Sequence, residues 1–336
     1  MGKQNVRALI FTGPRLALAL GTALIVAAAA VLALSGSNHP TNAAAVSSSS
    51  AAASDSGSDS ASGDASAGAS ASASASASAS PSASASASAS PTATTDPTQA
   101  LVAAVKDLIG DDDGHVSVAV EDLSTGTTVN DNLGDDYVTA SIVKLDILET
   151  LLYQDQKDGD SPGSDQREQI SAMIEQSDNA AASALYDDVG GSSAITAANK
   201  AFGLTDTEID DEAFGDSTTT VNDQIRLLRQ AFTANSVLTA AHRTYIQSLM
   251  GSVESDERWG VSAAADDASS SAKDYALKNG WLPRSATDLW EINSIGEVEH
   301  DGHEYLVAVL SRDNESMDSG IDVVQKVAKA AVDSQG

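Results

Sequence analysis

Cysteine is absent from the 336-residue chain. Its absence excludes disulfides, thiolate metal sites and cysteine nucleophiles, and it also removes the lipid-bearing cysteine of a bacterial lipoprotein. Basic residues are scarce, with 18 Lys and Arg against 48 Asp and Glu and a formal net charge of −30. A surface this acidic repels nucleic acid and anionic lipid headgroups, so we expect no nucleic-acid partner.

A long apolar run stands near the start of the chain. Three basic residues precede residues 16–34, which are apolar apart from one Gly and one Thr. A basic start followed by about 20 apolar residues predicts a secretory signal peptide or a transmembrane signal anchor over residues 1–36. Either segment would export the rest of the chain, because the basic residues should stay inside. We therefore expect an extracellular or cell-surface protein.

Residues 43–95 consist almost entirely of Ala and Ser. Their alternation provides neither face with enough apolar surface to offset the entropy of ordering. The composition predicts a disordered Ala/Ser-rich linker over residues 37–96, with a root-mean-square reach of roughly 40 Å. Such a spacer would lift a domain off a membrane or through a wall, so cell wall association is expected.

The remaining residues, 97–336, have the patterns of a globular domain. Apolar spacing predicts a helix ending near Ile109, then a hairpin of strands over 115–123 and 127–129. Helices are expected at about 140–155, 166–176, 179–187, 193–202, 220–233 and 240–251. Strands return at about 275–281, 288–294 and 303–311, and a last helix covers 321–332. This order predicts an α/β (α+β) fold, with a five-stranded antiparallel sheet flanked by N- and C-terminal helices and an inserted all-α subdomain.

A serine and a lysine share one face at the start of a predicted helix. Ser141 and Lys144 are three residues apart, so their side chains can meet. A serine hydroxyl needs a neighbour that takes its proton, and a lysine can do this when its pKa is lowered. The spacing alone is weak evidence, because Ser270 and Lys273 repeat it.

Two further motifs contain polar residues at marked positions. Ser177-Asp178-Asn179 falls between two predicted helices, where it could simply cap the second helix. Lys278-Asn279-Gly280-Trp281 falls within a predicted strand. The glycine there would let another backbone approach closely. We expect a substrate chain to lie along this strand, beside the N–H of Trp281.

The order of the three motifs is more specific than any one of them. Ser-x-x-Lys opens a helix, Ser-Asp-Asn lies between helices, and Lys-x-Gly lies on a strand, as in penicillin-recognising serine enzymes. Residues 97–336 therefore resemble the class A β-lactamase-like family, and especially exported actinobacterial serine hydrolases that carry Lys-Asn-Gly-Trp. Asn293-Ser294-Ile295-Gly296 adds to the resemblance.

The resemblance implies a set of roles in acyl transfer. Ser141 would be acylated, Lys144 would be its base, and Ser177 would pass a proton to the leaving nitrogen. The backbone N–H groups of Ser141 and Trp281 would form the oxyanion hole.

The resemblance also implies how the substrate is held. Asn179 would hold the substrate amide or the lysine, and Gly280 would allow close approach. Lys278 and Asn279 would face a substrate carboxylate. The expected partner is a small-molecule or peptide substrate, such as a β-lactam or a peptidoglycan-like peptide. No cofactor and no metal are expected, since the histidines lack metal-ligand spacing, and the protein is expected to be a monomer.

The sequence departs from the family in the region that should activate water. Class A β-lactamases carry a glutamate in a Glu-x-x-Leu-Asn setting, whereas residues 204–217 contain only scattered acids. Without that base, deacylation should be slow. Asn279 also replaces the usual threonine. A D,D-peptidase- or esterase-like enzyme and a non-catalytic cell-wall-binding surface protein remain alternatives.

Overall fold

The computed structural model describes residues 96–335, apart from 111–114, 132–134 and 268–273. The predicted signal or anchor and all of the predicted linker before Asp96 lie outside the described residues. The second Ser-x-x-Lys sequence, at residues 270–273, lies outside them too. Within the described ranges, no helix combines the length and the apolar character needed to cross a membrane.

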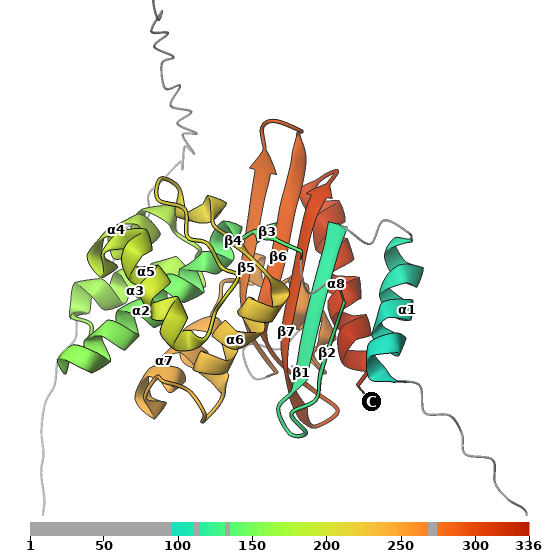
Figure 1. Cartoon of the computed structure of the whole chain (residues 1–336), viewed down its shortest axis with the longest axis horizontal. Coiled ribbons are helices and arrows are strands. Elements are labelled where there is room, and N and C mark those ends of the chain that lie inside the picture. Colours follow the sequence, from blue (N-terminus) through green and yellow to red (C-terminus); the bar gives the residue numbers. More distant parts are fainter. Residues whose placement is uncertain (1–95, 111–114, 132–134, 268–273, 336) are drawn as a thin grey trace, which may run out of the picture. The chain divides into compact units, whose positions relative to one another are not determined.

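The centre of the domain is an antiparallel sheet of five strands in the order β2-β1-β7-β6-β5 (Figure 1). The strands are β1 (Val116–Asp122), β2 (Thr128–Asp131), β5 (Tyr275–Arg284), β6 (Leu289–His300) and β7 (His303–Asn314). The hairpin from the start of the domain thus joins the three strands from its end, through the pairing of β1 with β7. The predicted sheet is confirmed.

Helices lie on both sides of this sheet (Figure 1). The N-terminal helix α1 (Pro97–Ile109) and the C-terminal helix α8 (Met317–Asp333) pack together on one side. The inserted helices form a block on the other side: α2 (Val143–Asp158), α3 (Ser164–Glu175), α4 (Asn179–Val189), α5 (Gly191–Phe202), α6 (Val221–Phe232) and α7 (Ala240–Met250). The predicted fold class is therefore confirmed.

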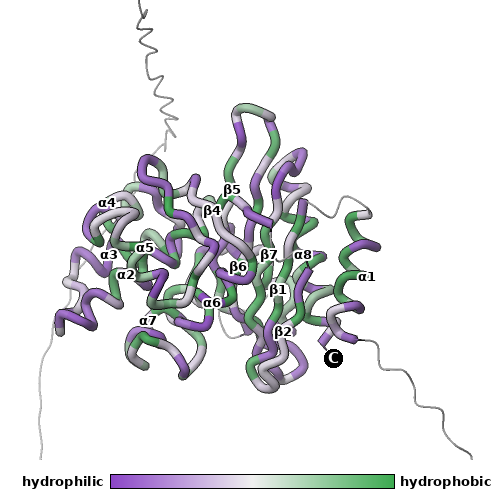
Figure 2. The backbone as a smooth tube through the Cα atoms, viewed as in Figure 1, coloured by the Kyte–Doolittle hydropathy of each residue, from purple (hydrophilic) through white to green (hydrophobic). Residues whose placement is uncertain are grey.

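Strand β7 shows how the sequence builds the two cores. Its residues at 306, 308 and 310 pack into the core of the helical block, whereas those at 305, 307 and 309 pack against α1 and α8. Successive side chains of a strand point to opposite faces, so a strand covered on both faces must be apolar throughout. Figure 2 shows hydrophobic residues along the central strands β1 and β7.

The structure contains a second, very small sheet that the periodicity did not predict. Strand β3 (Tyr137–Val138) pairs with β4 (Thr218–Thr219). Each has two residues, which is too short for an alternating pattern to be visible in a sequence. The small sheet joins the segment that leads into Ser141 to the segment that leads into α6.

Candidate active site

Ser141 lies on a single 3₁₀ turn, Ala140–Ile142, that leads into α2. The residue before it, Ala140, has a φ of 47°. A non-glycine residue rarely adopts this left-handed conformation, which costs energy and recurs at functional sites. The turn is held by its surroundings: the N–H of Thr139 donates to the carbonyl of Ser217 at 2.8 Å, and the Asn293 amide donates to the carbonyl of Thr139 at 3.1 Å.

Gly280 of β5 packs directly against this turn. A Cβ at position 280 would lie 2.9 Å from the backbone nitrogens of Ser141 and Ile142 and 2.8 Å from the carbonyl oxygen of Thr139. Real Cβ atoms do not come this close, so only glycine fits. The expected close approach at Gly280 is present, but the approaching backbone is the turn of Ser141. The contact also brings β5, with Trp281 next in sequence, to the side of the serine.

Lys144 is fully buried one helical turn after Ser141. Its ammonium donates to the Ser177 carbonyl at 2.5 Å, to Ser177 Oγ at 3.2 Å and to Asn179 Oδ1 at 2.8 Å. Burial, together with the charge of Lys278, lowers the pKa of Lys144 to about 7, against the raising effect of Glu257 and Asp178. A substantial fraction of Lys144 is therefore neutral near pH 7 and able to accept a proton.

The Ser-Asp-Asn segment meets both lysines at its first residue. Ser177 has a φ of 54° and is almost completely buried. The alternative role of this segment, helix capping, belongs to Asp178, whose carboxylate accepts from the N–H of Ala181 at 2.7 Å. Because Asp178 caps α4, the Ser177 hydroxyl is left to contact Lys144 and Lys278.

Lys278 is also fully buried, on the face of β5 that points towards the helical block. Its ammonium donates to Ser177 Oγ and to the Asn279 carbonyl, both at 3.0 Å. Burial lowers its pKa to about 8, whereas the nearby Glu257 carboxylate raises it. Glu257 Oε2 is 4.0 Å from Lys278 Nζ.

Glu257 was not predicted from the sequence. It belongs to the 3₁₀ turn Ser255–Glu257 between α7 and β5, and only 6% of its surface is exposed. Burial raises its pKa, and the positive charge of Lys278 lowers it. Nothing in the sequence marks this acid, because its partner Lys278 lies about twenty residues away on another element.

Asn279 does not face the cleft as expected. Its side-chain amide is buried and donates to the carbonyls of Glu257 at 2.7 Å and Trp259 at 3.1 Å. The reason is the geometry of a strand, since adjacent side chains point to opposite faces. With Lys278 directed towards Ser177, its neighbour must point to the other side, beneath the turn at Trp259.

A cleft of about 300 Å³ opens beside Ser141. It is lined by Ala140, Ser141, Asn179, Ala213, Phe214, Gly215, Asp216, Trp281 and Leu282. The predicted residues thus separate into two groups. Ser141, Asn179 and Trp281 border the cleft, whereas Lys144, Ser177 and Lys278 form the buried network behind it.

Two acids of residues 204–217 already have partners within the protein. Asp210 accepts from the backbone N–H groups of Glu212 and Ala213 at 2.8 and 2.7 Å, and these bonds lower its pKa. Asp216, the acid that lines the cleft, accepts from Arg284 at 2.6 Å.

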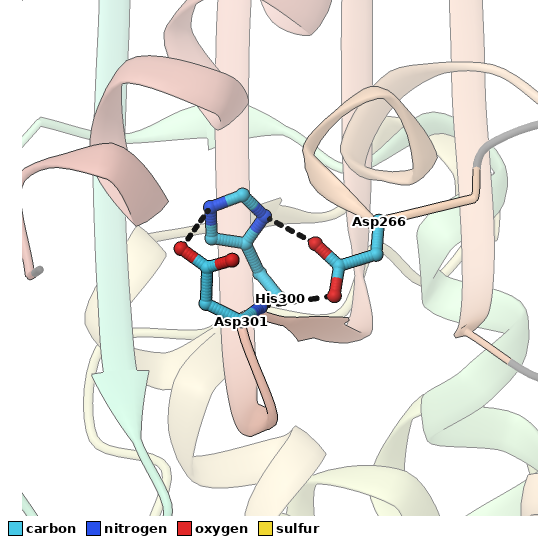
Figure 3. Close-up of side chains that lie close together, drawn as sticks. All are labelled: Asp266, His300 and Asp301. Carbon is cyan, nitrogen blue, oxygen red and sulfur yellow. Dashed lines mark hydrogen bonds and ion pairs between the residues drawn. The ribbon is translucent and has the colours of Figure 1, made fainter.

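One group of possible metal ligands lies outside this site. Asp266, His300 and Asp301 have ligand atoms within 4.8 Å of one another (Figure 3). His300 Nδ1 is 3.0 Å from Asp266 Oδ1, and the N–H of Asp301 donates to Asp266 Oδ2 at 3.0 Å. His300 ends β6, seven residues beyond Asn293, which is about 23 Å along a strand. The sequence did not indicate this group because Asp266 comes from a separate segment, and it is remote from Ser141.

The fold, with its serine and buried lysines, defines a serine hydrolase of the class A β-lactamase-like type. The model of the beta-lactamase enzyme family matches residues 157–335. This match covers more than half of the chain, and the chain belongs to that family. It begins after Ser141 and Lys144, so the roles of those two residues depend on the geometry described above.

Solved structures of low sequence identity share the fold of this chain. A class A beta-lactamase from Bacteroides cellulosilyticus has a TM-score of 0.61 at 18% identity, covering 71% of this chain and 98% of its own. The TLA-1 extended spectrum beta-lactamase has a TM-score of 0.62 at 17% identity, covering 71% and 99%. PBP-A has a TM-score of 0.58 at 16% identity, covering 70% and 95%. A search of curated proteins found no match.

Proposed function

We propose that this serine hydrolase transfers acyl groups through an acyl-Ser141 intermediate, on β-lactams or related amides and esters. The observation that carries the proposal is the convergence of two buried lysines on one hydroxyl behind the serine. Ser177 Oγ is 3.2 Å from Lys144 Nζ and 3.0 Å from Lys278 Nζ. Groups in hydrogen-bond contact, with pKa values near the working pH, can move protons during the reaction.

Acylation begins at Ser141 in this proposal. Neutral Lys144 takes the hydroxyl proton as Oγ forms a bond to the substrate carbonyl carbon. The carbonyl oxygen becomes negative and is stabilised by the N–H groups of Ser141 and Trp281. The contact of Gly280 with the turn of Ser141 supports this pairing, since it holds the two backbones together.

The tetrahedral intermediate then collapses by breaking the bond to the leaving group. A leaving nitrogen takes a proton from Ser177 Oγ, and Ser177 recovers one from the protonated Lys144. Lys278 keeps a positive charge beside this step. Asn179 holds Lys144 through its side-chain oxygen at 2.8 Å and also borders the cleft, so it is a positioning residue for the base.

We further propose that deacylation is slow. Hydrolysis of the acyl-enzyme needs a group that activates water. Asp216 is the acid among the described residues lining the cleft, and its carboxylate already accepts a hydrogen bond from Arg284 at 2.6 Å. The protein would then behave as a penicillin-binding enzyme. A variant of PBP-A has been solved as an acyl-enzyme complex with penicillin G, so a related fold can hold such an adduct.

Export is part of the proposal. The basic and apolar start of the sequence is typical of an exported protein and supports this part of the proposal. A linker of Ala and Ser would let the domain reach substrates in the wall.

Intact-mass spectrometry of the full-length chain, timed after mixing with penicillin G, tests the function. We expect a mass gain of one ligand that persists in the wild type and is absent from Ser141→Ala. Ser270→Ala is the matched control, because it alters the second Ser-x-x-Lys sequence, and it should keep the adduct. A transient adduct with hydrolysed drug in solution would disprove slow deacylation. No adduct in the wild type would disprove acyl transfer from a β-lactam.

A further inference from the structure

The walls of the cleft beside Ser141 are mainly apolar. Phe214, Trp281 and Leu282 provide its large side chains, and the described residues that line it include no lysine or arginine. Asp216 is the charged member of the lining. Apolar walls stabilise an apolar acyl group through burial, and a lone carboxylate repels an anionic one.

The leaving group of a substrate must lie on the other side of the serine, next to Ser177. In the proposed mechanism Ser177 Oγ protonates the leaving atom, so this atom comes within hydrogen-bond distance of the hydroxyl. A carboxylate attached close to the leaving nitrogen, as in a penicillin, would therefore fall near Lys278 and Asn279.

At that end of the site, two of the three N–H donors of Lys278 and the side-chain amide of Asn279 are already bonded within the protein. Lys278 has its ammonium bonded to Ser177 Oγ and the Asn279 carbonyl, both at 3.0 Å. The Asn279 amide, which could have donated to a carboxylate, is bonded to the carbonyls of Glu257 and Trp259. A new anion would have to displace these bonds or be left with few partners, and a poorly paired anion is costly at a buried position.

Lys278 already has an acidic side chain beside it. Glu257 Oε2 lies 4.0 Å from Lys278 Nζ, and this buried carboxyl oxygen has no hydrogen-bond partner among the described residues. Two opposite charges at such a distance attract one another, and they do so more strongly within a protein than in water. The carboxylate thus lessens the positive field that Lys278 would otherwise present to an anion.

Arg284 does not replace the missing positive charge. It follows Trp281 on β5 and donates to Asp216 at 2.6 Å. Its Nε also lies 3.9 Å from Glu291 Oε1. With two acids as neighbours, this arginine leaves no net positive charge at the rim of the cleft.

We infer that the acyl donors preferred by Ser141 are uncharged, with an apolar acyl group and a leaving group that lacks a carboxylate. Neutral esters and amides fit this description better than free-acid penicillins. The inference rests on the proposed function, because it assumes that Ser141 is the acylated residue and Ser177 the proton donor.

Penicillin G and its methyl ester form a matched pair for the test, since they differ only in the carboxylate. The rate of adduct formation on the full-length chain is measured for each by intact mass. Each rate is divided by that compound's rate of hydrolysis in hydroxide, which removes the difference in intrinsic reactivity. We expect the normalised rate to be at least about tenfold higher for the methyl ester, equivalent to about 1.4 kcal/mol.

A faster normalised rate for the free acid, with the adduct still on Ser141, would overturn the inference and leave the proposed function intact. If neither compound adds to Ser141, the proposed function fails and the inference fails with it. The ratio in the wild type tests the inference, and loss of the adduct in Ser141→Ala shows that the measured addition is on Ser141.

A second measurement tests the assigned cause. Glu257→Gln removes the negative charge beside Lys278, so the rate for the free acid should rise relative to the ester by about fivefold or more. Glu254→Gln changes an exposed acid of the same loop and should leave the ratio unchanged. An unchanged ratio in folded Glu257→Gln would overturn the contribution of Glu257.

Discussion

Helix α2 contains two groups of buried ionisable side chains whose surroundings differ. Lys144 has three acceptors within 3.2 Å, all from the Ser-Asp-Asn segment. Asp146 and Glu149 come later on the same helix and are equally buried. Asp146 accepts one hydrogen bond from Asn199 at 2.9 Å. Neither carboxyl oxygen of Glu149 has a hydrogen-bond partner among the described residues.

The difference in hydrogen-bond partners between Lys144 and the two acids determines what each can do. A buried charge with partners stays available for chemistry, whereas one without partners takes up a proton or costs stability. Burial raises the pKa of Asp146 to about 7, and it raises the pKa of Glu149 well above its usual value, with Asp146 adding to the effect. The lysine end of α2 therefore suits catalysis, and the acidic end makes folding depend on pH.

The largest expected effect comes from replacing Lys144, the buried residue of α2 that has hydrogen-bond partners. Lys144→Met should slow acylation of Ser141 by about 10²–10⁴-fold, because the serine loses its base. Lys157→Met is the matched control, since Lys157 is an exposed lysine on the same helix, and its rate should match the wild type. The rates are measured by intact mass with penicillin G. A Lys144→Met rate close to that of the wild type would exclude Lys144 as the base.

The pH dependence of acylation also tests the role of Lys144. Lys144 must be neutral to accept a proton, so the rate should rise with pH and level off above about 7. Below that value the rate should fall by about tenfold per pH unit. Loss of a proton from Lys278, with its pKa of about 8, should lower the rate again at higher pH. A rate that stays constant from mildly acidic to neutral pH would contradict a lysine base.

Much of this arrangement could be predicted from the sequence. Alternating apolar residues predicted the strands, and the return of strands after a helical block predicted a single sheet. Ser141, Ser177 and Lys278 were each predicted on the element where the structure places them. These predictions succeed because residue spacing along one helix or strand determines which face a side chain occupies.

Contacts between distant segments could not be predicted in this way. Glu257 meets Lys278 only because the turn before β5 folds back over that strand, and Asp266 meets His300 for a similar reason. Asn279 is a different case. Strand parity already implied that it would point away from its neighbour Lys278, and the resemblance to the family obscured that signal.

Glu149→Gln tests the effect of the buried Glu149 carboxyl, which lacks hydrogen-bond partners among the described residues, on stability. The folded-state pKa of Glu149 is raised, so its contribution to stability is complete below the unfolded value near 4.5 and is lost as pH rises. Glutamine does not titrate, so the variant avoids this loss. The free energy of unfolding of the variant, relative to that of the wild type, should be about 1–3 kcal/mol higher at about pH 8 than at about pH 5. Urea unfolding at both pH values measures this. Glu168→Gln, on the exposed face of α3, should show no such gain, and an equal gain in both variants would contradict the argument.

Asn199→Ala should have the smallest effect, because it removes a single hydrogen bond, from the neutral Asn199 amide to Asp146. The bond to Asp146 favours the charged carboxylate and holds its pKa down against burial. Its loss raises the pKa of folded Asp146 further, so the destabilisation should be larger at about pH 8 than at about pH 5. The cost should stay near about 1 kcal/mol. It is limited because Asn199 Oδ1 is itself buried without a partner among the described residues, and the substitution removes that unmet acceptor.

Asn235→Ala, in the exposed loop after α6, is the control for loss of an asparagine side chain. Urea unfolding of both variants at the same two pH values gives the differences needed. A loss in Asn199→Ala that is equal at the two pH values would mean that Asp146 keeps one protonation state throughout this range. The acidic end of α2 would then depend on Glu149 alone for its response to pH.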